Sequence, residues 1–332
     1  MTASAEQSRS TTPTAENLLL AVDAGGTKTA AWLVDLNRSE TDRVLGRGRA
    51  TGGNPLSVGF DAATRAVTEA IAAARSDAKQ PDTRVSQLIL SIAGAANEDV
   101  GKQFVEWVRS LGLAERVAVV SDVLPVLAAG TPHCVGVALI AGTGSVAFGR
   151  NADGKTQLCG GWGYLLGDEG SGFDIGRMGL SFALLELERG SDLHPMSAEL
   201  LKALGAKTVM HVTKSVYASA DPRATVASLA PIVVDFAERR LPDAKGIVDY
   251  AGLSLAKLVT RTTDLLGFKK YEHFSLAVGG GLLVKSDFVR AATNDALQKS
   301  GLRFEMMVVN EPLAGCVRLA SPEFAETLVK WQ

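Results

Sequence analysis

Two short glycine-rich stretches in this sequence follow largely apolar runs and contain threonine. Ala24–Thr29 (AGGTKT) comes after Leu18–Asp23, and Ala141–Ser145 (AGTGS) comes after Cys134–Ile140. Glycine allows positive φ angles and lets a ligand approach the backbone closely. Successive backbone N–H groups in such a turn form a concave site that binds anions. Both stretches are therefore candidate phosphate-binding turns.

Two familiar motifs overlap the second turn. Gly149–Thr156 (GRNADGKT) matches the P-loop pattern, which needs a helix at its Gly-Lys-Thr. Gly160 and Gly161 follow closely and would weaken that helix by about 1 kcal/mol each, and Asn-Ala-Asp-Gly is ordinary hairpin-turn chemistry. Gly142–Ala147 matches the dinucleotide fingerprint, but the residues after it are β-rich and stop at a turn. Neither motif explains the similar turn at Gly25.

A duplicated hairpin explains both turns. Strand, glycine turn, strand, polar turn and strand occur twice in the same order, once from Leu18 and once from Cys134. Two such hairpins would face each other across a cleft, and each would offer N–H groups and a hydroxyl, from Thr27 and Thr143, to one phosphate chain. A chance likeness of two β-hairpins is the alternative that the sequence leaves open.

Two further features fit a nucleotide with its metal. Asp23 closes the first strand and supplies a carboxylate for hydrated Mg²⁺, which keeps several waters and needs few protein ligands. Gly279–Gly281 lies between a strand and a helix and suits an adenine or ribose lying against bare backbone. The predicted cofactors are therefore ATP and Mg²⁺. The predicted nucleotide-binding residues are Gly25, Gly26, Thr27, Lys28, Thr143, Gly144, Gly279, Gly280 and Gly281.

Alternating strands and helices are expected to position these turns, which favours an α/β sheet with parallel members. The further strands are predicted at 30–35, 43–48, 85–92, 116–120, 146–150, 155–159, 274–278 and 306–309. The main helices are predicted at 61–74, 100–111, 173–188, from about 286, and at 313–320, with helical stretches as far as 266.

Length and composition exclude several classes of protein. A chain of 332 residues suggests two domains, and a net charge of −2 gives no basic balance for nucleic acid or anionic lipid. No apolar run reaches the roughly 20 residues of a membrane span. Three widely spaced cysteines indicate a reducing, cytoplasmic location. Residues 1–16 are Ser/Thr-rich without an apolar core, so we expect a disordered tail rather than a signal peptide.

Five motifs occur in order along nearly the whole chain after this tail: VDAGGTKT, SDVLPVLAAG, IAGTGSVAFG, GGWGYLLGDEGSG and AVGGGLLVKS. Together they resemble the BadF/BadG/BcrA/BcrD-type ATPase family of the actin–hexokinase–Hsp70 superfamily, and within it the N-acetylglucosamine kinases. The resemblance implies duplicated actin-like (ribonuclease H-like) α/β domains with a cleft between two lobes. The expected lobes are 17–131 and 132–312, with a C-terminal helix within 313–332 packing back on the first lobe.

The resemblance also implies an activity and its residues. The expected reaction is ATP-dependent phosphorylation of a hydroxyl of an amino sugar, with N-acetylglucosamine as the first expectation. Asp122 matches the family's catalytic aspartate and would act as general base. Asn54 matches an asparagine that hydrogen-bonds sugar hydroxyls, and the residues expected to line the sugar and its acetamido group are Gly161, Trp162 and Asp168.

Plainer interpretations exist for these side chains. Asp122 or Ser121 would simply cap the next helix, Trp162 would be a core residue, Asp168 would cap the helix after Ser171, and Glu169 would face solvent.

One departure from the family pattern affects which sugar is expected as the phosphoryl acceptor. The N-acetylglucosamine kinases tend to carry Asn after GTGS, and this chain has Val146. A lost hydrogen bond in a buried site costs about 1–3 kcal/mol, so glucosamine or another hexose stays open as the acceptor.

Proteins with other functions share the same fold. ATPases that activate 2-hydroxyacyl-CoA dehydratases share an iron–sulfur cluster across a dimer, and the cysteines here do not fall at the cluster positions. The histidines lack cysteine partners at the spacing of a zinc motif. A non-catalytic sensor would need neither Asp23 nor Asp122, and a dehydrogenase is a distant alternative. We expect a small sugar as substrate, no nucleic acid or membrane partner, and a possible homodimer.

Overall fold

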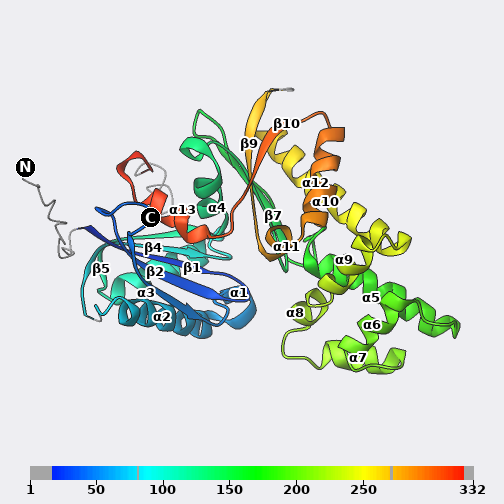
Figure 1. Ribbon diagram of the computed structural model, residues 1–332. Coiled ribbons are helices and arrows are strands. Elements are labelled where there is room, and N and C mark those ends of the chain that lie inside the picture. Colours follow the sequence, from blue (N-terminus) through cyan, green and yellow to red (C-terminus); the bar gives the residue numbers. More distant parts are fainter. Residues whose placement is uncertain (1–16, 81, 270–271, 325–332) are drawn as a thin grey trace, which may run out of the picture. The chain divides into compact units, whose positions relative to one another are not determined.

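The computed structural model describes residues 17–80, 82–269 and 272–324. The tail predicted at 1–16 lies outside the described residues. The chain forms two compact units (Figure 1): one contains residues 17–122 and 319–324, and the other contains residues 123–318. No helix in the described part of the chain is long and apolar enough to cross a membrane.

The first unit is built on a five-stranded sheet of order β3-β2-β1-β4-β5. Strands β1, β2 and β3 form an antiparallel meander, whereas β4 and β5 run parallel to β1. Because parallel strands end at the same edge of a sheet, β1, β4 and β5 bring their carboxyl ends together. The strands are β1 (Leu18–Ala24), β2 (Thr29–Asp35), β3 (Val44–Ala50), β4 (Val85–Ile92) and β5 (Ala114–Ser121).

Helices α2 (Phe60–Asp77) and α3 (Glu98–Ser110) cover one face of this sheet (Figure 1). The alanine-rich side of α2 lies very close to β3, because Gly46 and Gly48 carry no side chain there. A Cβ on Gly48 would lie 1.9 Å from the carbonyl oxygen of Ala70. The short helix α1 (Pro55–Val58) precedes α2. This packing fixes the sheet whose carboxyl edge carries the predicted site.

The second unit repeats the topology of the first. Its five-stranded sheet has the order β10-β9-β6-β7-β8, in which β6, β7 and β8 form the meander and β9 and β10 run parallel to β6. The duplication predicted from the sequence is therefore confirmed, as is the mixed α/β class. The strands are β6 (Gly136–Ala141), β7 (Ser145–Arg150), β8 (Thr156–Gly160), β9 (His273–Gly279) and β10 (Arg303–Val308).

Two helices pack on opposite faces of the second sheet. On one face, α10 (Pro242–Leu266) lies against β7, where a Cβ on Gly149 would meet Leu266 at 2.5 Å. On the other face, α4 (Val123–Gly130) lies against β9, where a Cβ on Gly279 would meet Val126 at 3.1 Å. This packing groups α4 with the second unit, whereas the sequence analysis placed 123–131 in the first lobe.

The remaining helices of the second unit lie before and after α10. Figure 1 shows α6, α7 and α8 set away from the strands of the second sheet, and α8 packs against α5. The helices are α5 (Gly172–Arg189), α6 (Pro195–Ala203), α7 (Val209–Tyr217), α8 (Pro222–Ala227), α9 (Ala230–Glu238), α11 (Gly281–Lys285), α12 (Asp287–Lys299) and α13 (Pro312–Leu319).

Helix α13 packs on α4. A Cβ on Gly315 would lie 1.8 Å from the carbonyl oxygen of Pro125, and Arg318 donates to the carbonyl of Ala128. The residues that follow, 319–324, belong to the first unit, where Gln87 Nε2 donates to the Ala320 carbonyl at 3.4 Å. That the C-terminal helix packs back on the first lobe stays a prediction, since 325–332 lie outside the described residues.

Candidate active site

The two aspartates predicted for metal binding and catalysis lie at the same edge of the first sheet. Asp23 is near the end of β1 and Asp122 follows β5, with β4 between them. Both are half-buried. Ser91 Oγ donates to Asp23 Oδ1 at 2.9 Å, and Ser121 Oγ donates to Asp122 Oδ1 at 3.3 Å. Two carboxylates one strand apart suit phosphoryl transfer, in which one holds the metal and the other takes a proton.

The first glycine turn lies at this edge too. Gly25 N–H donates to the Lys28 carbonyl at 3.0 Å, which closes the turn between β1 and β2. The segment Gly52–Gly53 packs directly on the turn, because Gly53 N–H donates to the Gly25 carbonyl at 2.9 Å. The residues between Gly25 and Thr29 are exposed. Their backbone N–H groups are therefore accessible to a ligand.

Asn54 follows the packed glycine pair and is thereby brought beside the turn. Its side-chain oxygen accepts from Leu56 N–H at 3.0 Å and caps α1. Its amide nitrogen has no hydrogen-bond partner among residues 17–80, 82–269 and 272–324. An amide nitrogen offers two donors, so Asn54 retains the part of its side chain that can bind a hydroxyl oxygen.

The second glycine turn is enclosed by α5. Gly142 N–H donates to the Gly144 carbonyl at 2.9 Å, and the first amides of α5 donate back to the turn. Gly172 N–H reaches the Gly142 carbonyl at 2.7 Å, and Phe173 N–H reaches the Thr143 carbonyl at 3.3 Å. These bonds satisfy the N–H groups that a helix leaves unpaired at its start, and they fix the shape of the turn.

The third glycine cluster lies against the second turn. Gly280 has φ +85°, and a Cβ there would lie 2.4 Å from the Ala141 carbonyl oxygen. A Cβ on Gly142 would lie 3.6 Å from Gly281 N. Thr143 and Gly144 are thus neighbours of Gly279–Gly281. The structure brings together these residues, all predicted for nucleotide binding.

Neither motif match in the second hairpin has the structure that its motif requires. Asn151 N–H donates to the Lys155 carbonyl at 3.0 Å, so the P-loop match is the turn of a β-hairpin. The dinucleotide match runs straight into β7, which pairs antiparallel with β6. Neither match begins the helix that its phosphate chemistry requires.

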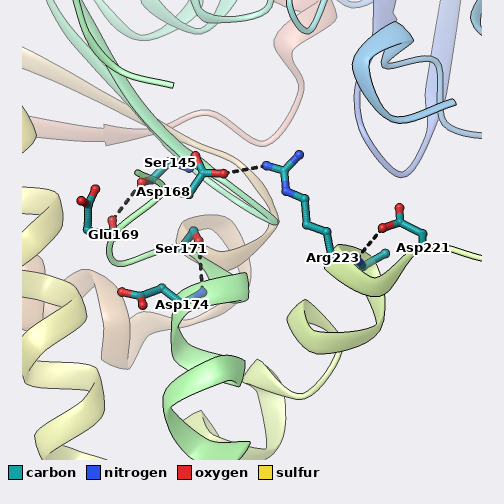
Figure 2. A network of polar contacts seen from close by, with 8 residues as sticks. Ser145, Asp168, Glu169, Ser171, Asp174, Asp221 and Arg223 are labelled. Carbon is teal, nitrogen blue, oxygen red and sulfur yellow. Dashed lines mark hydrogen bonds and ion pairs between the residues drawn. The ribbon is translucent and has the colours of Figure 1, made fainter. Parts of the chain in front are cut away.

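Asp168 is the centre of a buried polar network, shown in Figure 2. It is 2% exposed and has φ +64°, a conformation uncommon for a residue other than glycine. Its Oδ1 accepts from Ser145 N–H at 3.1 Å, and its Oδ2 accepts from Arg223 Nη2 at 2.9 Å. Ser145 Oγ donates to the Glu169 carbonyl at 2.9 Å. The carboxylate thus ties the segment after β8 to the start of β7 and to α8.

The helix-cap interpretation of Asp168 is wrong. Ser171 is the N-cap of α5, since its Oγ accepts from Asp174 N–H at 3.3 Å. Asp174 in turn accepts from Gly170 N–H at 3.0 Å. Asp168 is therefore free of the capping role that the sequence pattern allowed, and its side chain faces the second glycine turn.

Arg223 was not predicted from the sequence to be a site residue. It lies on α8, 55 positions from its partner Asp168, in a stretch without a recognisable motif. Its guanidinium carbon is also 5.9 Å from the centre of the Tyr164 ring. The available signal is chemical: a buried carboxylate requires a partner of opposite charge. The sequence does not say which of the many cations supplies it.

Trp162 is exposed, so the interpretation that it is a core residue is wrong. Its side chain is 58% accessible, and Arg261 lies over the ring with its guanidinium carbon 5.1 Å from the centroid. The preceding Gly161 N–H donates to the Ser145 carbonyl at 3.0 Å. Val146 contacts this glycine, since a Cβ there would lie 3.1 Å from Val146 Cγ2. Gly161, Trp162 and Asp168 thus all adjoin the start of β7. Glu169 is exposed, as its plainer interpretation has it.

The chain matches a family model over residues 20–314, that of the BadF/BadG/BcrA/BcrD ATPase family. The chain belongs to the BadF/BadG/BcrA/BcrD ATPase family. This confirms the resemblance carried by the five motifs. Its matched region includes both glycine turns and both candidate aspartates, Asp23 and Asp122.

Among its relatives, the BadF-type chain is 29% identical over 195 residues to an N-acetylmuramic acid/N-acetylglucosamine kinase of Clostridium acetobutylicum, a match that spans 59% of this chain and 64% of that protein. It is 29% identical over 279 residues to an N-acetyl-D-glucosamine kinase of Dictyostelium discoideum, covering 80% of this chain and 85% of the relative. Both relatives carry names of amino-sugar kinases.

Solved structures share the fold of this BadF-type protein. A candidate N-acetylglucosamine kinase of Chromobacterium violaceum superposes with a TM-score of 0.71 at 22% identity. The superposition covers 93% of this chain and 100% of that kinase. A glucokinase of the ROK family from Streptomyces griseus gives a TM-score of 0.51 at 17% identity, with 94% and 99% coverage. At these identities the likeness concerns the fold, and it confirms the actin-like α/β class.

Proposed function

We propose that this protein is an ATP-dependent kinase that phosphorylates a hydroxyl of an amino sugar, with N-acetylglucosamine as the favoured acceptor. The observation that carries the proposal is the carboxyl edge of the first sheet, where Asp23, the first glycine turn, Asn54 and Asp122 come together. Membership of an ATPase family and the names of the two relatives support the same reaction.

The residues at this edge take distinct roles. Asp23 fits a Mg²⁺ ion, which binds proteins through one or two carboxylates and completes its shell with waters and phosphate oxygens. When bound, the ion would neutralise phosphate charge. The N–H groups of Gly25–Lys28 and of Thr143–Gly144 bind phosphate oxygens. Lys28 adds an exposed positive charge. Asp122 accepts the proton of the acceptor hydroxyl as that oxygen attacks the γ-phosphate.

The acceptor sits with the residues around the start of β7. Gly161, Trp162 and Asp168 contact the sugar, and Asn54 donates to a sugar hydroxyl. A bacterial relative is named for N-acetylmuramic acid as well as N-acetylglucosamine, so both belong among the acceptors to be tested. A cytoplasmic location, where ATP and sugars are present, and a homodimer remain part of the proposal.

The test is phosphorylation of a panel of sugars. ADP release would be followed with N-acetylglucosamine, glucosamine, glucose, N-acetylmannosamine and N-acetylmuramic acid, and the sugar phosphate would be detected by mass spectrometry. We expect one ADP for each sugar phosphate formed. ADP release without sugar phosphate would instead indicate an ATPase, and the proposed function would then be wrong.

Asp122→Asn tests the general base. The variant should retain ATP binding, because the amide keeps the shape of the carboxylate, and kcat should fall about 100- to 10,000-fold. Asp61→Asn, at an exposed position in the first turn of α2, is the matched control and should keep wild-type kcat. Near-normal turnover by Asp122→Asn would remove Asp122 from the mechanism.

A further inference from the structure

Arg223 holds unused hydrogen-bonding capacity beside the second glycine turn. A guanidinium has five N–H donors, and within the described residues Arg223 makes one hydrogen bond, from Nη2 to Asp168. Its Nε is buried without a partner among those residues. The side chain is 22% exposed. Part of a charged, donor-rich group therefore reaches solvent next to a residue proposed to contact the sugar.

The position of this guanidinium is fixed from several sides. Asp168 holds one end, and the ring of Tyr164 lies 5.9 Å from the guanidinium carbon. A Cβ on Gly144 would lie 2.4 Å from Arg223 Nη2, so the guanidinium occupies the space that a side chain at position 144 would need. Such contacts restrict an otherwise flexible side chain, and a restricted donor loses less entropy when it binds an acceptor.

We propose that Arg223 is a specificity-determining residue that selects an N-acetylated amino sugar over the free amine. The inference rests on the proposed sugar-kinase function. The part of the Arg223 guanidinium that reaches solvent donates to the carbonyl oxygen of the acetamido group, while Asp168 holds the guanidinium in place. The guanidinium can donate hydrogen bonds to a carbonyl oxygen. The ammonium group of glucosamine would instead place a second positive charge next to the guanidinium and be repelled by it.

This inference also accounts for Val146. An apolar side chain at that position supplies no hydrogen bond to the sugar, and Val146 lies against Gly161 in the same part of the unit. Arg223 supplies a donor from α8 instead. Because Asp168 balances its charge, the pair is close to neutral and can bind a neutral sugar without leaving a buried charge unpaired.

The test compares acceptors rather than a single rate. Arg223→Gln and Arg223→Lys would be assayed for kcat/KM with N-acetylglucosamine, glucosamine and glucose. We expect Arg223→Gln to lower the ratio of kcat/KM for N-acetylglucosamine over glucosamine at least about tenfold, mainly through the KM of the acetylated sugar. The KM for ATP should stay within about threefold of the wild-type value.

Two controls separate selectivity from stability. Arg177→Gln removes another arginine of the same unit, one that pairs with Asp174 at 2.8 Å, and it should leave the sugar ratio unchanged. Arg223→Lys keeps the charge beside Asp168 but lacks the planar fork. It should therefore fold normally and still lose selectivity, even where Arg223→Gln folds poorly.

The possible results are distinct. An equal loss of kcat/KM for all three sugars in both Arg223 variants would make Arg223 a purely structural residue and overturn the inference. A wild-type enzyme that prefers glucosamine would overturn it as well and leave the kinase function intact. A wild-type protein that phosphorylates none of the sugars would overturn the proposed function itself.

Discussion

The two glycine turns occupy equivalent places in the repeated topology but are held in different ways. The pair Ala24–Thr29 closes the first hairpin, and the pair Ala141–Ser145 closes the second. The first turn is backed by the glycine backbone of 52–53 and is largely exposed. The second is backed by the start of α5, by Asp168 and by Arg223.

The two hydroxyls at the same register show the difference most directly. Ser145 Oγ donates to the Glu169 carbonyl at 2.9 Å. Thr29 Oγ1 is buried beside Gly53 and has no hydrogen-bond partner in the described part of the chain. The two turns therefore share the strand order and the glycines, while the buried ion pair of Asp168 and Arg223 lies beside the second turn. One turn is shaped by backbone packing and the other by side-chain charge.

The largest expected effect comes from removing the acid of the second turn. Asp168→Ala should destabilise the protein by about 3 kcal/mol, because it leaves Arg223 without its counter-ion and Ser145 N–H without its acceptor. Asp23→Ala, the matched change at the first turn, should cost about 1 kcal/mol, since Asp23 is half-buried and its loss removes the hydrogen bond from Ser91 Oγ. Urea unfolding would measure both, and equal losses would contradict the comparison.

Alanine in place of glycine gives the next contrast. A Cβ on Gly144 would lie 2.8 Å from both carboxylate oxygens of Asp168, so Gly144→Ala must displace the ion pair and should cost about 1–3 kcal/mol. A Cβ on Gly26 meets nothing within 4 Å. The free energy of unfolding of Gly26→Ala should therefore lie within about 0.5 kcal/mol of the wild-type value in the same urea experiment. A costly Gly26→Ala would mean that the first turn is as confined as the second.

The smallest effect concerns the two hydroxyls. Ser145→Ala should lose about 1 kcal/mol, because it removes a buried hydrogen bond to the Glu169 carbonyl. Thr29→Val keeps the shape of the side chain and removes a buried, unpaired hydroxyl. It should leave stability unchanged or raise it by up to about 1 kcal/mol. Thermal unfolding of both variants checks the pair, and destabilisation by Thr29→Val would reveal a partner for that hydroxyl.

The sheets could be predicted because their signals are local. An apolar, β-branched run predicted the strand at 85–92, which is β4 with the same bounds, and the helix predicted at 173–188 is α5, Gly172–Arg189. The glycine turns are likewise short-range patterns. The repeat then led to the correct duplicated topology.

The environment of Asp168 could not be predicted in this way. Its ion pair joins residues 55 positions apart, and no local sequence pattern marked the positive φ of 64° at this position. The helices α6, α7, α8 and α9 appeared in the sequence only as an alanine- and leucine-rich region, so nothing indicated which helix would face the turn. Sequence periodicity locates elements, but it does not pair charges across them.

The position of helix α8 outside both sheets has a consequence for how sugar preference can change during evolution. The helix is a six-residue element, Pro222–Ala227, outside both sheets, and it meets the second turn through one guanidinium. Substitutions, insertions or deletions in this helix can alter the chemistry offered to an acceptor without disturbing any strand pairing. Diversification of sugar preference within the family would then be expected to concentrate in this peripheral segment, while the duplicated framework is inherited intact.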